Sequence, residues 1–142
     1  PHLLSSLLEE SGDLTSFKKI FQTPPSPYWR QHYTFGKPSS KTTSNGLSEQ
    51  SVQLLLINFV LPIWFAYGEF HDQEEWKDRC FSLLQSLPAE QNYVLRKFVS
   101  HDWIPKTAFD SQGMLELYRR YCSAQKCLSC KIGQSLLRGH PK

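Results

Sequence analysis

The sequence predicts an all-α fold, a single bundle-like domain of about six helices packed around a buried central helix at Val52–Tyr67. The stretch Val52–Gly68, VQLLLINFVLPIWFAYG, is apolar on nearly every side, so as a helix it must be surrounded by protein or by lipid. A spanning helix needs about 20 apolar residues, and this stretch is shorter and contains Pro62, so we expect a protein core and no membrane. Apolar residues recur at helical spacing on both sides of the stretch, and no alternating strand pattern is visible.

Two short helices are expected before the central one. The first, His2–Glu10, carries one apolar face made of Leu3, Leu4, Leu7 and Leu8. Asp13 is a suitable N-cap for the second, which should extend to about Gln22 and end at the prolines that follow.

An aromatic segment, Tyr28–Gly36, comes next. We expect it to be extended or irregular and to bury its rings across the helices, before a polar loop at 37–47.

Several local signals place the remaining helices. Ser48 begins the central helix, Pro62 should kink or split it, and Gly68 fits its end. Further helices are expected after a capping box at Asp72 and Glu75, after Pro88, after Asp110 or Ser111, and over 132–137.

Length and charge support one domain over residues 1–142, with a basic, cysteine-containing tail at 119–142. The 142 residues are 39% hydrophobic and 20% charged, as in a soluble globular protein. Residues 1–113 carry ten Lys/Arg and twelve Asp/Glu, whereas 114–142 carry six and one. This basic end favours an acidic partner or nucleic acid, with Arg119, Arg120, Lys126 and Lys131 as the binding candidates; the alternative is a solvated chain end.

The strongest site signal is Cys122-x4-Cys127-x2-Cys130. Two thiolates separated by two residues suit a zinc ion or an iron–sulfur cluster, with Cys80, His101 or His140 as a fourth ligand. Nearby arginines and lysines should lower the thiol pKa values. The alternatives are three reduced structural thiols, which need no cofactor, and redox or disulfide chemistry. Three of the four cysteines lie within nine residues, which indicates a reducing, cytoplasmic setting.

Two other groups have both a structural and a functional interpretation. His71 lies among Glu69, Asp72, Glu74 and Glu75, a set able to hold a divalent metal but also suited to capping a helix. Aromatic and positively charged residues are interleaved in the segment that contains Trp29, Arg30, His32 and Tyr33, which is typical either of core packing or of single-stranded nucleic-acid binding. No catalytic set is visible in the sequence.

Five stretches resemble the C-terminal region of a bacterial family of unknown function, found mainly in Bacteroidetes: SPYWRQHYTFG, LLLINFVLPIWFAYG, LPAEQN, FDSQGMLELYRRYC and CLSCKIG. The resemblance implies that the chain is the C-terminal part of a longer protein with a separate N-terminal domain. It also implies a C-terminal tail that contains Cys122, Cys127 and Cys130 but not Cys80.

These observations favour a non-catalytic accessory or interaction domain, whose basic end docks a partner or the N-terminal domain. The alternative is a metal- or iron–sulfur-binding element of a nucleic-acid-processing enzyme. We expect no enzyme activity of this chain alone.

Overall fold

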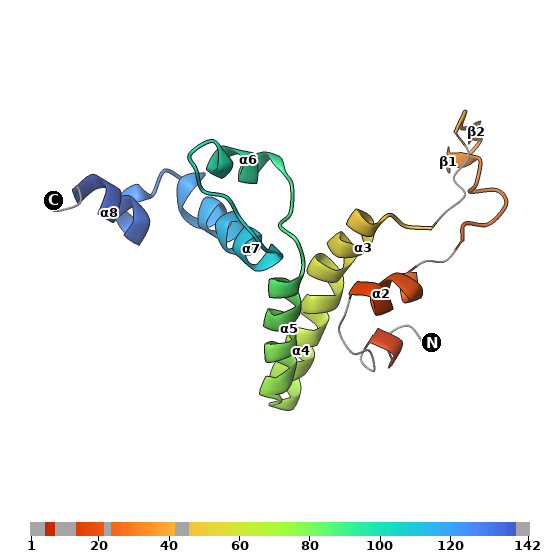
Figure 1. Cartoon of the computed structure of the whole chain (residues 1–142), viewed down its shortest axis with the longest axis horizontal. Coiled ribbons are helices and arrows are strands. Elements are labelled where there is room, and N and C mark those ends of the chain that lie inside the picture. Colours follow the sequence, from red (N-terminus) through yellow and green to blue (C-terminus); the bar gives the residue numbers. More distant parts are fainter. Residues whose placement is uncertain (1–4, 8–13, 22–23, 42–45, 139–142) are drawn as a thin grey trace. The chain divides into compact units, whose positions relative to one another are not determined.

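The computed structural model describes residues 5–7, 14–21, 24–41 and 46–138, within two compact units, 1–83 and 84–142. The first unit contains helix α2 (Leu14–Phe21), strands β1 (His32–Thr34) and β2 (Lys37–Pro38), and the consecutive helical segments α3 (Glu49–Leu55), η1 (Leu56–Val60) and α4 (Leu61–His71). Helix α5 (Glu74–Ser86) ends in the second unit, which also contains α6 (Tyr93–Val99), α7 (Ala108–Leu117), η2 (Tyr118–Cys122), η3 (Cys127–Ser129) and α8 (Lys131–Arg138) (Figure 1). The all-α prediction is confirmed, since the described strands form only a two-stranded sheet.

The central helix is continuous from Glu49 to His71 and contains one π-helical turn, η1. Ser48 caps it, as predicted, by accepting a hydrogen bond from the Ser51 amide. The amide of Leu61 donates to the carbonyl of Leu56, five residues back. Pro62 therefore stands in the first turn of α4, where a missing amide costs little. Of the two predicted effects of Pro62, a kink or a split, the split is wrong, because the helix continues through the π turn and the proline.

Trp64 of α4 is the centre of the first unit. Its indole is fully buried, and its Nε1 donates a 3.0 Å hydrogen bond to the carbonyl of Leu7. Its ring centroid lies 5.5 Å from that of Phe17 in α2 and 5.7 Å from that of Trp76 in α5. The guanidinium of Arg79 lies over both indoles, 4.7 and 4.5 Å from their centroids. Leu7 is in a described helical turn, but Leu3, Leu4, Leu8, Asp13 and Gln22 of the predicted first helices lie outside the described residues.

Only part of the central helix is buried. Its inward residues recur at steps of about four: Val52, Leu56, Val60, Trp64 and Gly68. Large apolar side chains are exposed elsewhere on it, including Leu54, Phe59, Phe65 and Phe70. Glu49–His71 is one helix in the described part of the chain that is long and apolar enough to cross a membrane, and 44% of its most apolar window is buried inside the structure. A core helix passes the same test, and the contacts of Trp64 show that one face of this helix packs within the first unit.

The turn between α4 and α5 brings these two helices close together. Asp72 is left-handed, with φ of 55°, and the Gln73 amide donates to the Gly68 carbonyl at 2.8 Å, a Schellman end. The predicted capping box at Asp72 and Glu75 is therefore wrong, and Gly68 lies inside the helix instead of ending it. A Cβ on Gly68 would lie 2.8 Å from the Cβ of Trp76, so close helix approach requires glycine.

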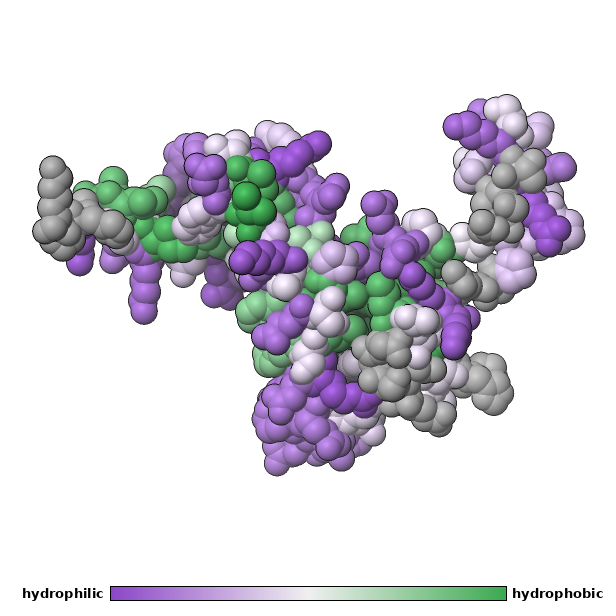
Figure 2. Space-filling view, in the orientation of Figure 1, coloured by the Kyte–Doolittle hydropathy of each residue, from purple (hydrophilic) through white to green (hydrophobic). Residues whose placement is uncertain are grey.

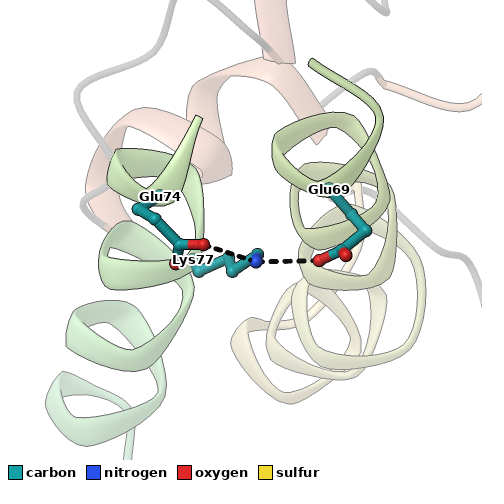
Figure 3. Close-up of polar contacts among 3 residues, drawn as sticks. All are labelled: Glu69, Glu74 and Lys77. Atoms are coloured by element: carbon teal, nitrogen blue, oxygen red, sulfur yellow. Dashed lines mark hydrogen bonds and ion pairs between the residues drawn. The ribbon is translucent and has the colours of Figure 1, made fainter. Parts of the chain in front are cut away.

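The charged residues around this turn form ion pairs. Lys77 Nζ lies 2.8 Å from carboxylate oxygens of both Glu69 and Glu74, linking α4 to α5 (Figure 3). The hydrogen bond with Glu69, then that with Glu74, raises the pKa of Lys77. His71 contacts the rings of Tyr67 and Phe70. Among the residues that the structure describes, no three His, Cys, Asp or Glu side chains are placed to hold a metal ion.

The aromatic segment forms a small hairpin instead of lying in a core. Strands β1 and β2 are antiparallel, and Gly36 turns between them with φ of +71°. Tyr28, Trp29, Tyr33 and Phe35 are all exposed. The prediction that their rings are buried is wrong, because the rings pack on one another.

In the second unit, the chain from Leu87 to Asn92 is held against α7. The amide of Ala108 donates to the Leu87 carbonyl at 2.9 Å. The fully buried hydroxyl of Ser111 accepts from the Glu90 amide and donates to the Thr107 carbonyl. Thr107 and Asp110 form the capping box of α7, where hydrogen bonds from the amides of Lys106 and Thr107 lower the pKa of Asp110.

Gly68→Ala should destabilise the protein by about 1–3 kcal/mol, because the new methyl group overlaps Trp76 and the Gln73 carbonyl. Urea unfolding followed by tryptophan fluorescence measures the change. Gly113→Ala is the matched control: in α7 its Cβ would meet nothing within 4 Å, so helix propensity should stabilise the protein by about 0.5–1 kcal/mol. Equal effects of the two variants would contradict the close approach of α4 and α5.

Candidate functional site

The cysteine segment is a compact turn between two helices. The π turn η2 ends at Cys122, and Gln125 follows in the left-handed region with φ of 53°. The Gln125 amide donates to the Cys122 carbonyl and the Lys126 amide to the Tyr121 carbonyl, which is again a Schellman end. This end directs the chain into the single turn of η3.

Gly133 holds η3 against α8. The amide of Cys130 donates to the Cys127 carbonyl at 3.2 Å, and the amide of Gln134 donates to the Cys130 carbonyl at 2.8 Å. A Cβ on Gly133 would lie 2.5 Å from the Cys127 carbonyl oxygen, a backbone atom, so only glycine allows this approach. The CLSCKIG stretch, residues 127–133, is therefore one compact turn followed by the start of α8.

An apolar pocket of about 480 Å³ opens beside this turn. The end of α6 and the loop after it contribute Phe98, His101 and Trp103. Residues of α7 and η2 that line the pocket are Leu117, Tyr121 and Cys122. The remaining wall comes from η3, α8 and the residue between them: Cys127, Cys130, Ile132, Gly133 and Leu136.

A second hollow of about 610 Å³ adjoins the pocket. The two share Trp103, Leu117 and Ile132, and the second extends along α7 past Phe109 and Met114. Together they form a groove over α7, which we call the C-terminal groove. Exposed apolar side chains lie beside it, and Figure 2 shows hydrophobic surface over α8.

All three predicted cysteine ligands line this pocket, and His101, one of the three alternatives for a fourth ligand, lines it too. Cys122 and Cys127 are exposed, whereas Cys130 is buried. Cys80 belongs to the other unit, where its thiol donates to the Leu61 carbonyl at 3.5 Å, and His140 lies outside the described residues. As they stand, no three His, Cys, Asp or Glu side chains in the described ranges converge closely enough to hold an ion.

The thiol chemistry differs from the prediction. Burial, and then the nearby thiols of Cys130 and Cys127, raise the pKa of Cys122. The expectation that basic neighbours lower it is wrong for this residue, because Arg119 and Arg120 instead pair with Glu116, at 2.7 and 2.6 Å. Burial raises the pKa of Cys80 to about 11.

Three positively charged residues are close in the sequence to residues that line the pocket: Lys126 precedes Cys127, Lys131 precedes Ile132, and Arg138 follows Leu136 by two residues. Lys126, Lys131 and Arg138 are exposed and form no ion pair with any described residue. The other predicted binding residues, Trp29, Arg30, His32 and Tyr33, belong to the hairpin in the first unit.

Seven residues that line the pocket were not predicted as site residues: Phe98, Trp103, Leu117, Tyr121, Ile132, Gly133 and Leu136. The loop after α6 is difficult to recognise in the sequence, because its left-handed residue is Asp102, with φ of 63°. Glycine is the residue that usually marks such a helix end.

A family model described as a protein of unknown function (DUF2851) matches residues 1–93. The matched range includes the hairpin, the central helix and α5, and it ends at the first residue of α6. The cysteine turn and the C-terminal groove lie outside it. No curated protein and no solved structure matches the chain.

Cys122 should react with iodoacetamide only at higher pH than a cysteine in the unfolded chain. A raised pKa keeps the thiol protonated as pH increases through the ordinary value of 9.0, and the thiolate is the nucleophile. Cys80, with a pKa about two units high, should label about 100-fold more slowly near pH 8. Peptide mass spectrometry from pH 7 to 11 measures both, with the chain in guanidinium as the control. Labelling of Cys122 at pH 7 that is faster in the folded chain than in the chain in guanidinium would contradict the structure.

Proposed function

Because the chain belongs to the DUF2851 family of proteins of unknown function, we propose a function from the site itself: a non-catalytic interaction module. Its C-terminal groove binds an acidic, amphipathic helical segment of a protein partner. The observation that carries this proposal is the apolar pocket, whose lining residues are close in the sequence to the exposed Lys126, Lys131 and Arg138.

The pocket suits an apolar anchor. A volume of about 480 Å³ accommodates one or two bulky side chains, and aromatic residues wall one side of it. Interfaces concentrate their binding energy in such buried anchors. The adjoining hollow along α7 lengthens the groove, as required by a helix that presents apolar residues at i, i+3 or i+4 and i+7.

These three positively charged residues determine the charge of the partner. Lys126, Lys131 and Arg138 have no carboxylate partner among the residues described, so acidic side chains beside the anchor would meet uncompensated positive charge. A basic segment would be repelled. We place the acidic segment in the N-terminal domain that the resemblance implies for a longer protein. The setting that we propose for this interaction is the reducing cytoplasm, which the four free cysteines support.

Leu136→Ala should weaken this interaction about tenfold, because Leu136 lines the pocket and is 76% exposed, so its side chain is open to the bound segment. The measurement is selection from a random peptide display library, followed by fluorescence anisotropy with the enriched peptides. Selected peptides should combine bulky apolar residues with Asp and Glu. Lys131→Gln should reduce the salt dependence of binding.

Leu137→Ala is the matched control for this test. Leu137 is the next residue of α8 and is 65% exposed, but it does not line the pocket. Equal losses for the two leucine variants, or selection of basic peptides, would overturn the proposal.

A second candidate function is metal binding. It is favoured by one observation, that Cys122, Cys127, Cys130 and His101 line one pocket, as a Cys₃His zinc set requires. Cys122 and Cys127 are exposed and can change rotamer without losing buried contacts, so their thiols can turn toward Cys130. A bound zinc ion would stabilise the cysteine turn. An iron–sulfur cluster at the same residues would instead suit the metal-binding element of a nucleic-acid-processing enzyme.

Protein purified without oxygen should then contain about one zinc, or iron in cluster stoichiometry, per chain, measured by elemental analysis and absorption spectroscopy. The double variant Cys127→Ser, Cys130→Ser should lose it. Cys80→Ser should retain it, since Cys80 lies in the other unit. Metal retained by the double variant would exclude this site.

A further inference from the structure

The hairpin segment 24–41 has a composition unlike that of any other part of the chain. Residues 14–48 contain five Lys/Arg and no Asp or Glu. Residues 22–46 contain no Ala, Val, Leu, Ile or Met, so the large apolar side chains of this stretch are all aromatic rings. On the face shown in Figure 2 the hairpin is purple to white, in contrast to the green over α8.

The rings form an ordered cluster at the surface. Tyr28 and His32 are stacked, with centroids 4.1 Å apart and planes 4° from parallel. Trp29 meets Phe35 edge to face at 4.9 Å. Tyr33 and Phe35 nevertheless remain 68% and 82% exposed. The cluster thus presents aromatic surface to solvent without the usual burial of such residues in a core.

Hydrogen bonds between side chains and the backbone, and one within the backbone, hold this arrangement. The Gly36 amide donates to the Tyr28 hydroxyl at 2.9 Å, which fixes the turn against the first ring. His32 Nδ1 lies 2.9 Å from the Tyr28 carbonyl oxygen, and the Ser39 amide donates to the Gln31 carbonyl at 2.6 Å. A ligand that stacks on these rings therefore meets a preformed surface, which reduces the entropy lost on binding.

The charges on the hairpin are available to an anion. Arg30, Lys37 and Lys41 are exposed and form no ion pair within the described part of the chain. Arg30 uses its Nε to donate to the Pro25 carbonyl at 3.3 Å. Lys18, by contrast, pairs with Glu49 at 2.7 Å.

We propose that the hairpin 24–41 binds single-stranded nucleic acid, with bases stacked on its exposed rings and phosphates paired with Arg30, Lys37 and Lys41. Exposed aromatic rings interleaved with cations are the features that single-strand-binding surfaces share. A protein core would combine such rings with aliphatic side chains and bury them, whereas this segment lacks Ala, Val, Leu, Ile and Met and its rings are exposed. The site is in the first unit and is independent of the C-terminal groove.

The test is fluorescence anisotropy of the whole 142-residue chain with a fluorescein-labelled 20-nucleotide oligo(dT) at 25–200 mM NaCl. Three phosphate contacts predict that the logarithm of the affinity falls with the logarithm of salt concentration with a slope of about −2. A duplex of the same length should bind more weakly, because its bases are already stacked. Failure to bind at 25 mM NaCl, or equal binding of the duplex, would overturn the proposal.

Phe35→Ala should weaken binding about tenfold through the lost stacking surface. Phe70→Ala removes a ring that is 85% exposed on α4, outside the hairpin, and should leave the affinity unchanged. Circular dichroism of each variant checks folding. Equal losses for Phe35→Ala and Phe70→Ala would contradict the assigned site.

Lys41→Gln gives a second readout that does not depend on the ring cluster, since Lys41 lies outside both strands. It should reduce the salt slope by about 0.7, whereas Lys106→Gln in the second unit should not. Vesicles containing phosphatidylserine are the competing anionic surface. Ring-dependent binding to these vesicles as tight as that to oligo(dT) would assign the hairpin to lipid and refute the proposal.

Discussion

The hydrogen bond from the Trp64 indole to the Leu7 carbonyl is the contact on which the first unit depends. It is buried, and it joins positions 57 residues apart in the chain. Losing it would leave the Leu7 carbonyl without its buried donor, at a cost of about 1–3 kcal/mol. The same ring contacts Phe17, Trp76 and Arg79, so one side chain sets the positions of a turn, α2 and α5 against the central helix. An indole is suited to this role because it combines a large apolar surface with one polar donor.

The second unit is stabilised differently. Its described core is small, and polar contacts fix its backbone: the Ser111 hydroxyl bonds both the Glu90 amide and the Thr107 carbonyl, and Thr107 with Asp110 caps α7. Much of its apolar surface lines hollows instead of filling them. A framework fixed by hydrogen bonds leaves such surface available to a ligand without loss of the fold.

The sequence predicted the parts of the structure that have strong local signals. An uninterrupted apolar stretch located the central helix, and ligand spacing identified the cysteine turn, whose three thiols do line one pocket. Three helix ends were difficult to predict because Asp72, Asp102 and Gln125 occupy left-handed positions where glycine is the usual signal. The rings of Tyr28–Phe35 were misassigned because aromatic residues usually indicate a core. The pocket depends on Phe98 and Trp103 lining the same hollow as residues of α8, a tertiary arrangement that no local pattern specifies.

The π turn at Leu56–Val60 explains how one helix keeps a single buried face. Val52 and Gly68 are sixteen residues apart, and at about 100° per residue a regular α-helix would place them about 160° apart around its axis. One additional residue in a π turn reduces this offset to about 60°, which brings Trp64 and Gly68 round to the side of Val52. The turn is equivalent to a one-residue insertion. A relative that lacked that residue would have α4 turned by about 100°, with a different side of it facing α5. An alignment gap within 56–60 would therefore signal a different packing of α4 on α5.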